Sequence, residues 1–370
     1  MVAGRIVLLG ATGYTGALTA RAMARRGERP VLAGRDGARL QALASELGGL
    51  DTQVADVARP DSVRALVERG DVLVSTVGPF SRLGGPAVDA AVAAGAHYLD
   101  STGETPFIRE VFERHGPAAA RVGSALVTAF GFDWVPGNLA GALALREAGA
   151  AATRVEIGYF VTGRGFAASG GTRASGAGAL LEPSVVWRDG RLAGEPVARR
   201  VRAFELGAGA ARGRRDAVSV GGSEHLALPR AHPQLRDVRV FLGAGRASRA
   251  VQALGVAVAA SVRVPGARRV LEAALRRAVH GSTGGQDDGT RRATGCLVVA
   301  EAFAAEGAHL RTVRLTGPNP YDLTASLLAW GAGVAAAGEL RGAGALGPVD
   351  GLGLDALESG CEAAGLARTS

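Results

Sequence analysis

The stretch Ile6-Val7-Leu8-Leu9-Gly10-Ala11-Thr12-Gly13-Tyr14-Thr15-Gly16 decides the fold of this chain. Its four leading apolar residues are typical of a short buried strand, and a helical pattern starts directly behind them. Glycines at 10, 13 and 16 have the spacing of a phosphate-binding turn between a strand and a helix. The first permits the sharp turn, the second lets the backbone approach a pyrophosphate, and the third lets the helix pack on the strand. The sequence therefore predicts a dinucleotide-binding unit here.

The residues expected to hold the cofactor's phosphates are Gly10, Thr12, Gly13, Tyr14, Thr15 and Gly16. They lie at a helix N-terminus, where free N–H groups face an anion. The second expected strand, residues 30–33, ends in Gly34-Arg35-Asp36. At this position an acid binds a ribose 2′-hydroxyl, whereas an arginine accommodates a 2′-phosphate. Arg35 therefore predicts NADP(H), with the alternative that Asp36 faces the ribose.

Six apolar runs alternate with helical patterns up to about residue 150, at 6–9, 30–33, 52–55, 72–75, 97–100 and 125–128. This alternation predicts a doubly wound parallel sheet, an α/β Rossmann domain. Ligands of such sheets lie outside the carboxyl ends of the strands. We therefore expect Asp56 near the adenine, and Gly78, Pro79 and Phe80 along the nicotinamide ribose.

From residue 154 the pattern changes to strands in series, at 154–162, 197–204, 237–242, 296–303 and 310–315, with a hairpin signal at Asp189-Gly190. Strands with few helices between them predict a mainly antiparallel sheet. We expect a second, α+β domain over residues 151–317, for substrate binding or dimerisation, interrupted by a helical pattern at about 247–280. Helical patterns at 321–340 and 355–364 are expected to return to the first domain, which then comprises residues 1–150 and 318–370.

Composition excludes several classes of function. All 42 basic residues are arginine, so neither a lysine Schiff base nor the tyrosine–lysine pair of short-chain dehydrogenases exists here. The formal charge is +8, but the arginines are dispersed among 34 acids, so we expect no nucleic-acid partner. Two cysteines and six histidines without ligand spacing predict no metal. The longest apolar stretch is shorter than the ~20 residues of a membrane span, and no signal peptide is visible, so we expect a cytoplasmic protein without a membrane partner.

Four segments carry a family resemblance: residues 10–16, Val77-Gly78-Pro79-Phe80, residues 96–104 and residues 131–138. In this order they resemble the saccharopine dehydrogenase-like NADP-binding oxidoreductases, and among them the bacterial trans-acting enoyl reductases. The resemblance implies NADPH-dependent hydride transfer to an activated C=C bond in a small-molecule or carrier-tethered substrate of polyketide, lipid or other secondary metabolism. The alternatives are a C=N (imine) reductase or amine dehydrogenase, and a non-catalytic NADP-binding regulator. The oligomeric state is left open, with a homodimer as one alternative.

The substrate pocket is expected to be lined by Phe80, Thr102, Phe132, Trp134, Thr172 and Arg173. No catalytic residue is assigned, and three candidates stand: Glu104, Asp133 and Tyr98. A carboxylate that acts as an acid needs a pKa raised by burial. Each candidate has a structural alternative: a first-turn helix acid for Glu104, a residue before a helix start for Asp133, and a core side chain for Tyr98.

Overall fold

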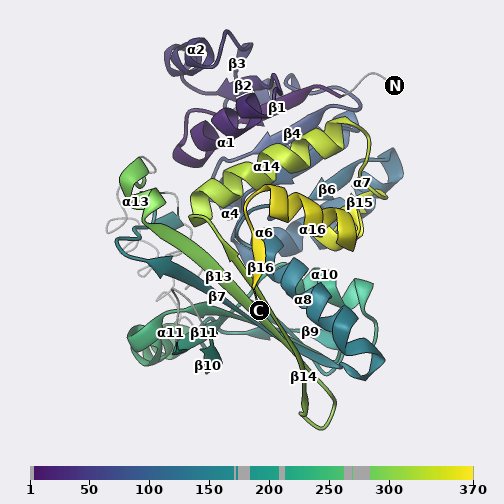
Figure 1. Ribbon diagram of the computed structural model, residues 1–370. Coiled ribbons are helices and arrows are strands. Elements are labelled where there is room, and N and C mark those ends of the chain that lie inside the picture. Colours follow the sequence, from purple (N-terminus) through teal and green to yellow (C-terminus); the bar gives the residue numbers. More distant parts are fainter. Residues whose placement is uncertain are drawn as a thin grey trace. The chain divides into compact units, whose positions relative to one another are not determined.

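The computed structural model describes residues 4–170, 172–173, 184–207, 213–261, 269 and 284–369 (Figure 1). The chain divides into two compact units. The first comprises residues 1–103, 107–135 and 321–364, and the second comprises residues 104–106, 136–320 and 365–370. The division falls at residue 136 instead of near residue 150, because the helix over Val135–Ala148 is counted with the second unit from its second residue on.

The first unit contains a seven-stranded sheet in the order β15-β6-β5-β4-β1-β2-β3, and all of its pairings are parallel. The strands are β1 (Ile6–Leu9), β2 (Val31–Gly34), β3 (Thr52–Val54), β4 (Val72–Ser75), β5 (His97–Asp100), β6 (Ala125–Val127) and β15 (Gly344–Ala345). The predicted Rossmann sheet is confirmed. Strand order reverses between β1 and β4, and ligands of such sheets bind outside the carboxyl ends at this switch point.

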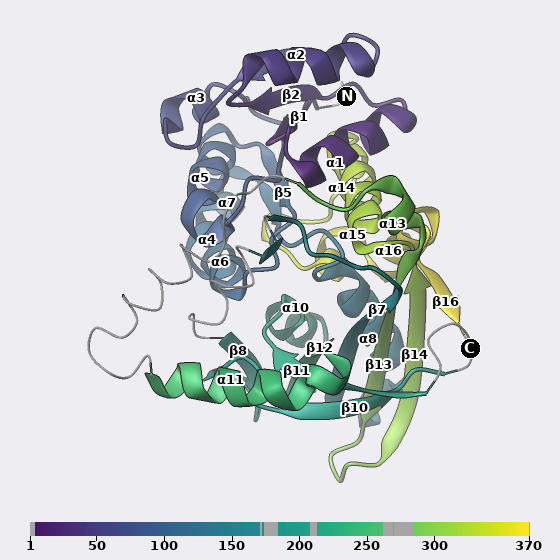
Figure 2. The same ribbon diagram turned by 90° about the vertical axis from the view of Figure 1, so that its left-hand side faces the viewer.

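Helices connect these strands as the sequence patterns predict (Figures 1 and 2). They are α1 (Tyr14–Arg25), α2 (Gly37–Glu46), α3 (Pro60–Arg64), α4 (Phe80–Leu83), α5 (Gly85–Ala94), α6 (Thr105–Glu110), a π-helical turn (Val111–His115) and α7 (Gly116–Val122). After residue 320 come α14 (Pro320–Ala336), α15 (Pro348–Leu352) and α16 (Leu354–Ala363). The chain thus returns to the first unit, where the ring of Trp330 in α14 stacks on Phe130 at 6.1 Å between centroids.

The second unit contains a nine-stranded sheet with the main path β10-β11-β12-β7-β13-β14-β16. Its strands are β7 (Arg154–Gly163), β8 (Ser184–Arg188), β9 (Arg191–Glu195), β10 (Val201–Glu205), β11 (Arg214–Val220), β12 (Asp237–Gly243), β13 (Thr294–Phe303), β14 (His309–Gly317) and β16 (Ala367–Thr369). Only β7 and β12 pair in parallel, so the predicted mainly antiparallel sheet is confirmed. The expected hairpin joins β8 to β9, and its turn residues Asp189 and Gly190 have φ of 55° and 75°, as a type I′ turn requires.

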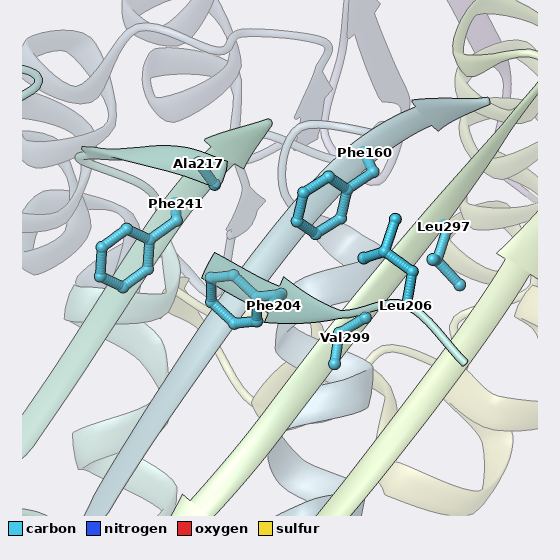
Figure 3. Close-up of a cluster of buried hydrophobic side chains, with 7 residues drawn as sticks. All are labelled: Phe160, Phe204, Leu206, Ala217, Phe241, Leu297 and Val299. Atoms are coloured by element: carbon cyan, nitrogen blue, oxygen red, sulfur yellow. The ribbon is translucent and has the colours of Figure 1, made fainter. Parts of the chain in front are cut away.

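One face of this sheet carries an aromatic core. Figure 3 shows the buried cluster of Phe160, Phe204, Leu206, Ala217, Phe241, Leu297 and Val299. The described helices of the unit are α8 (Val135–Ala148), α10 (Glu224–Ala231), α11 (Ser248–Ser261) and α13 (Asp288–Arg292). The helix expected over about residues 247–280 is observed as α11 over its first half, and most of the second half lies outside the described residues. Strands β11 and β16 and helix α10 were not anticipated. Residues 365–370, expected in the first domain, are counted with the second unit because β16 pairs with β14.

We predict that Gly331→Ala destabilises the protein by about 1–3 kcal/mol, because the added methyl group would overpack the core. A Cβ at this buried position in α14 would lie 2.9 Å from Leu99 Cδ2 and closer still to the ring of Phe130. Gly85→Ala is the matched control, since a Cβ there meets nothing within 4 Å. Urea unfolding of both variants tests this, and equal stability of the two would contradict the packing argument.

Candidate functional site

The glycine turn between β1 and α1 is built by close backbone contact. Gly10 has a φ of 87°, a left-handed conformation that favours glycine, and a Cβ there would lie 2.7 Å from Thr76 Oγ1. A Cβ on Gly16 would collide with the carbonyl oxygen of Gly10 and lie 2.9 Å from the same hydroxyl. Both positions therefore require glycine, and α1 starts in direct contact with the end of β1.

The same turn is open at Gly13. Gly13 is exposed, and a Cβ on it would contact only the Gly10 carbonyl oxygen, at 3.2 Å. Gly13 is also the N-cap of α1 and supplies no side-chain hydrogen bond, and the first turn of the helix contains no acid. An uncapped helix N-terminus without a nearby acid is the arrangement that the phosphates of a dinucleotide require.

The loop after β4 is tied to this turn. Thr76 Oγ1 lies 3.2 Å from the carbonyl oxygens of both Leu9 and Gly10, to which it donates. The loop continues through a cis Gly78–Pro79 peptide into α4. The side chain of Phe80 is buried and packs on Phe107 at 5.6 Å between ring centroids. The expected nicotinamide-ribose residues thus belong to a loop held at the switch point of the sheet.

Two exposed arginines lie after β2, where the sequence predicts the adenosine end of the cofactor. Arg35 follows β2, and among the described residues its guanidinium has no partner. Asp36 is occupied as the N-cap of α2, where its Oδ1 accepts from the Arg39 N–H at 3.1 Å. Arg39, which the sequence analysis missed, donates from Nη2 to the Thr12 carbonyl oxygen at 3.0 Å and so joins α2 to the glycine turn.

In the turn after β3, Asp56 makes two local hydrogen bonds. Its Oδ1 accepts from the Ala58 N–H at 3.0 Å, and its backbone N–H donates to Ser62 Oγ. Within the described part of the chain, Oδ2 accepts no hydrogen bond. Asp56 Oδ2 therefore remains available for the adenine contact that the sequence predicts.

Asp133 is the carboxylate with the most unusual surroundings. It is half-buried in the loop after β6, between the buried side chains of Phe132 and Trp134. Its carboxylate makes no hydrogen bond or ion pair within the described ranges. Burial raises the pKa of Asp133 to about 6. Gly103, in the loop after β5, lies next to this carboxylate: a Cβ built on Gly103 would lie 3.0 Å from Asp133 Oδ2.

Tyr98 is placed differently. Its side chain is fully buried within β5, and burial followed by the nearby Asp100 carboxylate raises the pKa of its hydroxyl well above the ordinary value of 10.0. Such a phenol stays protonated. These surroundings match the core alternative for Tyr98, so Asp133 is the stronger proton-donor candidate of the first unit.

The remaining expected pocket residues fall in both units. Thr102 is fully buried in the first unit, beside the backbone of the β5 loop. Glu104, which is buried, is counted with the second unit. Thr172 and Arg173 are exposed members of the second unit, where Thr172 Oγ1 lies 2.9 Å from Ser169 Oγ and Arg173 donates to the Ala168 carbonyl oxygen at 2.7 Å.

A buried polar group of the second unit was missed by sequence analysis. The Tyr159 hydroxyl donates to Glu224 Oε1 at 2.6 Å and accepts from the Gly137 N–H at 2.8 Å. Asn138 donates to Ser223 Oγ at 2.8 Å. These contacts fix the start of α8 on β7 and α10. The only signal was the Gly-Asn pair at 137–138, because Tyr159 and Glu224 are far apart in sequence.

In the stretches the structure describes, no helix is long and apolar enough to cross a membrane. No group of three or more histidine, cysteine or acidic side chains with the geometry to hold a metal ion occurs in those stretches.

Comparison with known proteins agrees with this geometry for the first unit. Residues 6–127 match the family model of the saccharopine dehydrogenase NADP binding domain. These residues therefore resemble the NADP-binding domain of that family, and the expected resemblance and the expected cofactor, NADP(H), are both confirmed.

Individual relatives extend the comparison. Trans-acting enoyl reductases of Mycobacterium ulcerans and Mycobacterium leprae are 41% and 40% identical to the chain over 140 residues. The matched part is 36% of this chain and only 34% of each relative. Apo saccharopine dehydrogenase (L-Glu forming) from Saccharomyces cerevisiae has a similar structure, with a TM-score of 0.63 over 99% of both chains at 14% identity. This last likeness shows the fold alone.

We predict that Asp133→Asn becomes more stable relative to the unchanged protein as the pH rises from 4 to 7.5. The pKa of Asp133 is raised from 3.8 to about 6, so the folded state is disfavoured once this carboxyl ionises. Its stabilising contribution is complete below pH 4 and is lost as the pH rises through 6. One pKa unit corresponds to about 1.4 kcal/mol, and half-burial reduces the total to about 1–2 kcal/mol.

Urea unfolding at several pH values measures this difference. Asp61→Asn is the control, because the Asp61 side chain is 94% exposed and its ion pair with Arg64 lies on the surface. A stability difference for Asp133→Asn that does not change with pH would contradict the assignment of a raised pKa.

Proposed function

We propose that this chain is an NADPH-dependent oxidoreductase that reduces an activated C=C bond, as an enoyl reductase acting in trans on a small-molecule or carrier-tethered thioester. The observation that carries the proposal is the identity of about 40% with trans-acting enoyl reductases over 140 residues. The chain shares only about a third of those relatives' length, so the substrate class is part of the proposal.

The first unit supports the choice of cofactor. The exposed N-terminus of α1 fits a pyrophosphate, and Arg35 has a free guanidinium where a 2′-phosphate would lie. Asp36 caps α2 through Oδ1, so one oxygen of the acid that could bind a ribose 2′-hydroxyl is already engaged, while Arg35 is not. The arrangement therefore favours NADP(H) over NAD(H).

Asp133 supports the reduction chemistry. When bound, NADPH supplies a hydride, and reduction of a conjugated C=C bond also needs a proton at the neighbouring carbon. With a pKa of about 6, Asp133 keeps a usable protonated fraction at neutral pH, and no partner among the described residues competes for its proton. We assign it the role of general acid, for which a pKa near the working pH is favourable.

The alternatives place other demands on the site. Saccharopine-like substrates carry several carboxylates, which call for clustered arginines. Three arginines are candidates from the sequence: Arg82 on α4 and Arg164 after β7 are exposed, whereas Arg173 donates to the Ala168 carbonyl oxygen. Imine reduction and a purely regulatory role are the other outcomes that the activity test distinguishes.

We predict that the protein oxidises NADPH in the presence of 2-enoyl thioesters of N-acetylcysteamine or of an acyl carrier protein, followed at 340 nm. The matched substrates are saturated thioesters, which must give no turnover, and cyclic imines. Turnover of imines alone would assign the second function. Tight NADPH binding without any turnover would assign the regulatory one.

Asp133→Asn is the catalytic control in this assay. Removing a general acid lowers kcat by roughly 100-fold or more, while NADPH affinity is retained. In the unchanged protein kcat falls as the pH rises above about 6, since the protonated form is lost, and the variant lacks this limb. Asp61→Asn leaves both properties unchanged.

We predict that Arg35→Gln weakens NADPH binding by roughly 10- to 100-fold, since a hydrogen bond to a charged group contributes about 1.5–3 kcal/mol. NADH affinity changes by less than about twofold, because that cofactor lacks the 2′-phosphate. Fluorescence titration of both cofactors measures the two constants. Arg121→Gln, at an exposed position on α7, is the matched control, and equal losses for NADPH and NADH would overturn the assignment.

A further inference from the structure

Asp100, at the carboxyl end of β5, is fully buried and organises the loops around it. Its Oδ1 accepts from the backbone N–H groups of Thr102 at 2.9 Å and Ala129 at 2.8 Å. Its Oδ2 accepts from Thr128 Oγ1 at 2.7 Å. One carboxylate thus binds both the loop after β5 and the loop after β6.

The second loop adopts a conformation that needs such support. Ala129 has a φ of 60°, a left-handed conformation that costs a residue with a Cβ about 1–2 kcal/mol. The Ala129 N–H is held by the Asp100 side chain, and the next N–H, of Phe130, donates to the Asp100 carbonyl oxygen at 2.7 Å. Asp100 therefore holds this turn by side chain and backbone together.

The two loops meet again at Asp133. Gly103, in the first loop, lies so close that a Cβ there would be 3.0 Å from Asp133 Oδ2. The other side of the second loop is fixed by α14, where Thr324 Oγ1 accepts from the Phe132 N–H at 3.0 Å. Because Asp133 itself makes no hydrogen bond in the described residues, its place is set by the loops that carry it.

We propose that Asp100 is a positioning residue for Asp133, acting by clamping the β5 and β6 loops so that the Asp133 carboxyl stays beside Gly103. The proposal rests on the proposed role of Asp133 as general acid. Asp100 does not itself contact the reacting atoms. Misplacement of a catalytic group by about 1 Å can cost roughly 100-fold in rate, so the clamp has a kinetic consequence beyond stability.

The first arm of the test compares two substitutions of the clamp. Asp100→Ala removes all three side-chain hydrogen bonds, and we expect kcat to fall by roughly 100-fold with NADPH affinity nearly unchanged. Asp100→Asn keeps an Oδ1 acceptor for the two N–H groups, and its amide can donate to the Thr128 hydroxyl. We therefore expect Asp100→Asn to recover most of kcat.

The second arm is a double-mutant cycle. If Asp100 acts through Asp133, Asp100→Ala lowers kcat by less than about twofold once Asp133→Asn is present, because residues that act as a unit are not additive. Ser124→Ala is the matched control, since Ser124 is a buried residue that donates to the Ala96 carbonyl oxygen at the opposite end of β5 and β6. We expect Ser124→Ala to lower the free energy of unfolding and to leave kcat unchanged. Equal kcat losses from Asp100→Ala in both backgrounds would overturn the proposal.

A third measurement separates this proposal from the proposed function. The pH-dependent stability difference between the unchanged protein and Asp133→Asn reports the placement of that carboxyl without any turnover. With Asp100→Ala present, this difference should shrink by roughly half or more, because a released carboxyl regains water. An unchanged difference would overturn the positioning role, even if no substrate is found. Should Asp100→Ala fail to fold, Thr128→Val removes one hydrogen bond of the clamp and allows the same cycle.

Discussion

The contact between the backbone of Gly16 and the carbonyl oxygen of Gly10 is the constraint on which the first unit depends. No side chain fits between them, so α1 starts immediately against the end of β1. This closeness places the N-terminus of α1 at the point where strand order reverses. The phosphate site that the sequence predicts would therefore be formed by backbone atoms, and both Gly10 and Gly16 must lack a side chain for it to form.

The close backbone contacts of the glycine turn lie in the part of the chain where sequence similarity to known proteins is found. The family-model match lies in residues 6–127, while a similar fold extends over 99% of the chain at 14% identity. A cofactor of fixed shape restricts which residues fit around it. A sheet core accepts many apolar combinations of the right volume, and the aromatic cluster of Phe160, Phe204 and Phe241 is one of them (Figure 3).

The loops at the carboxyl ends of β5 and β6 contain two carboxylates, Asp100 and Asp133, that are held in different ways. Most buried polar groups are fixed by their own hydrogen bonds. Asp100 follows that pattern with three donors, whereas Asp133 has none in the described residues and is carried by its loop. Burial raises the pKa of both carboxyls to about 6, but only Asp133 keeps oxygens unengaged by the protein. The first carboxylate shapes the loops, and the second is left available for chemistry.

The sequence by itself determined the Rossmann sheet, six of its seven strands to within about one residue, and the glycine turn, because strand and helix periodicities and the need for glycine are local properties. The short edge strand β15 has no such local pattern and was not predicted. It also predicted Arg35 as the charge that would meet a 2′-phosphate, since this prediction depends on one strand end. Only the tertiary structure decided that Asp36 caps α2, that Asp100 joins two loops, and that Tyr159 and Glu224 fix the start of α8. Those contacts join residues on different elements, and the choice among partners for a carboxylate depends on which backbone N–H groups folding brings beside it.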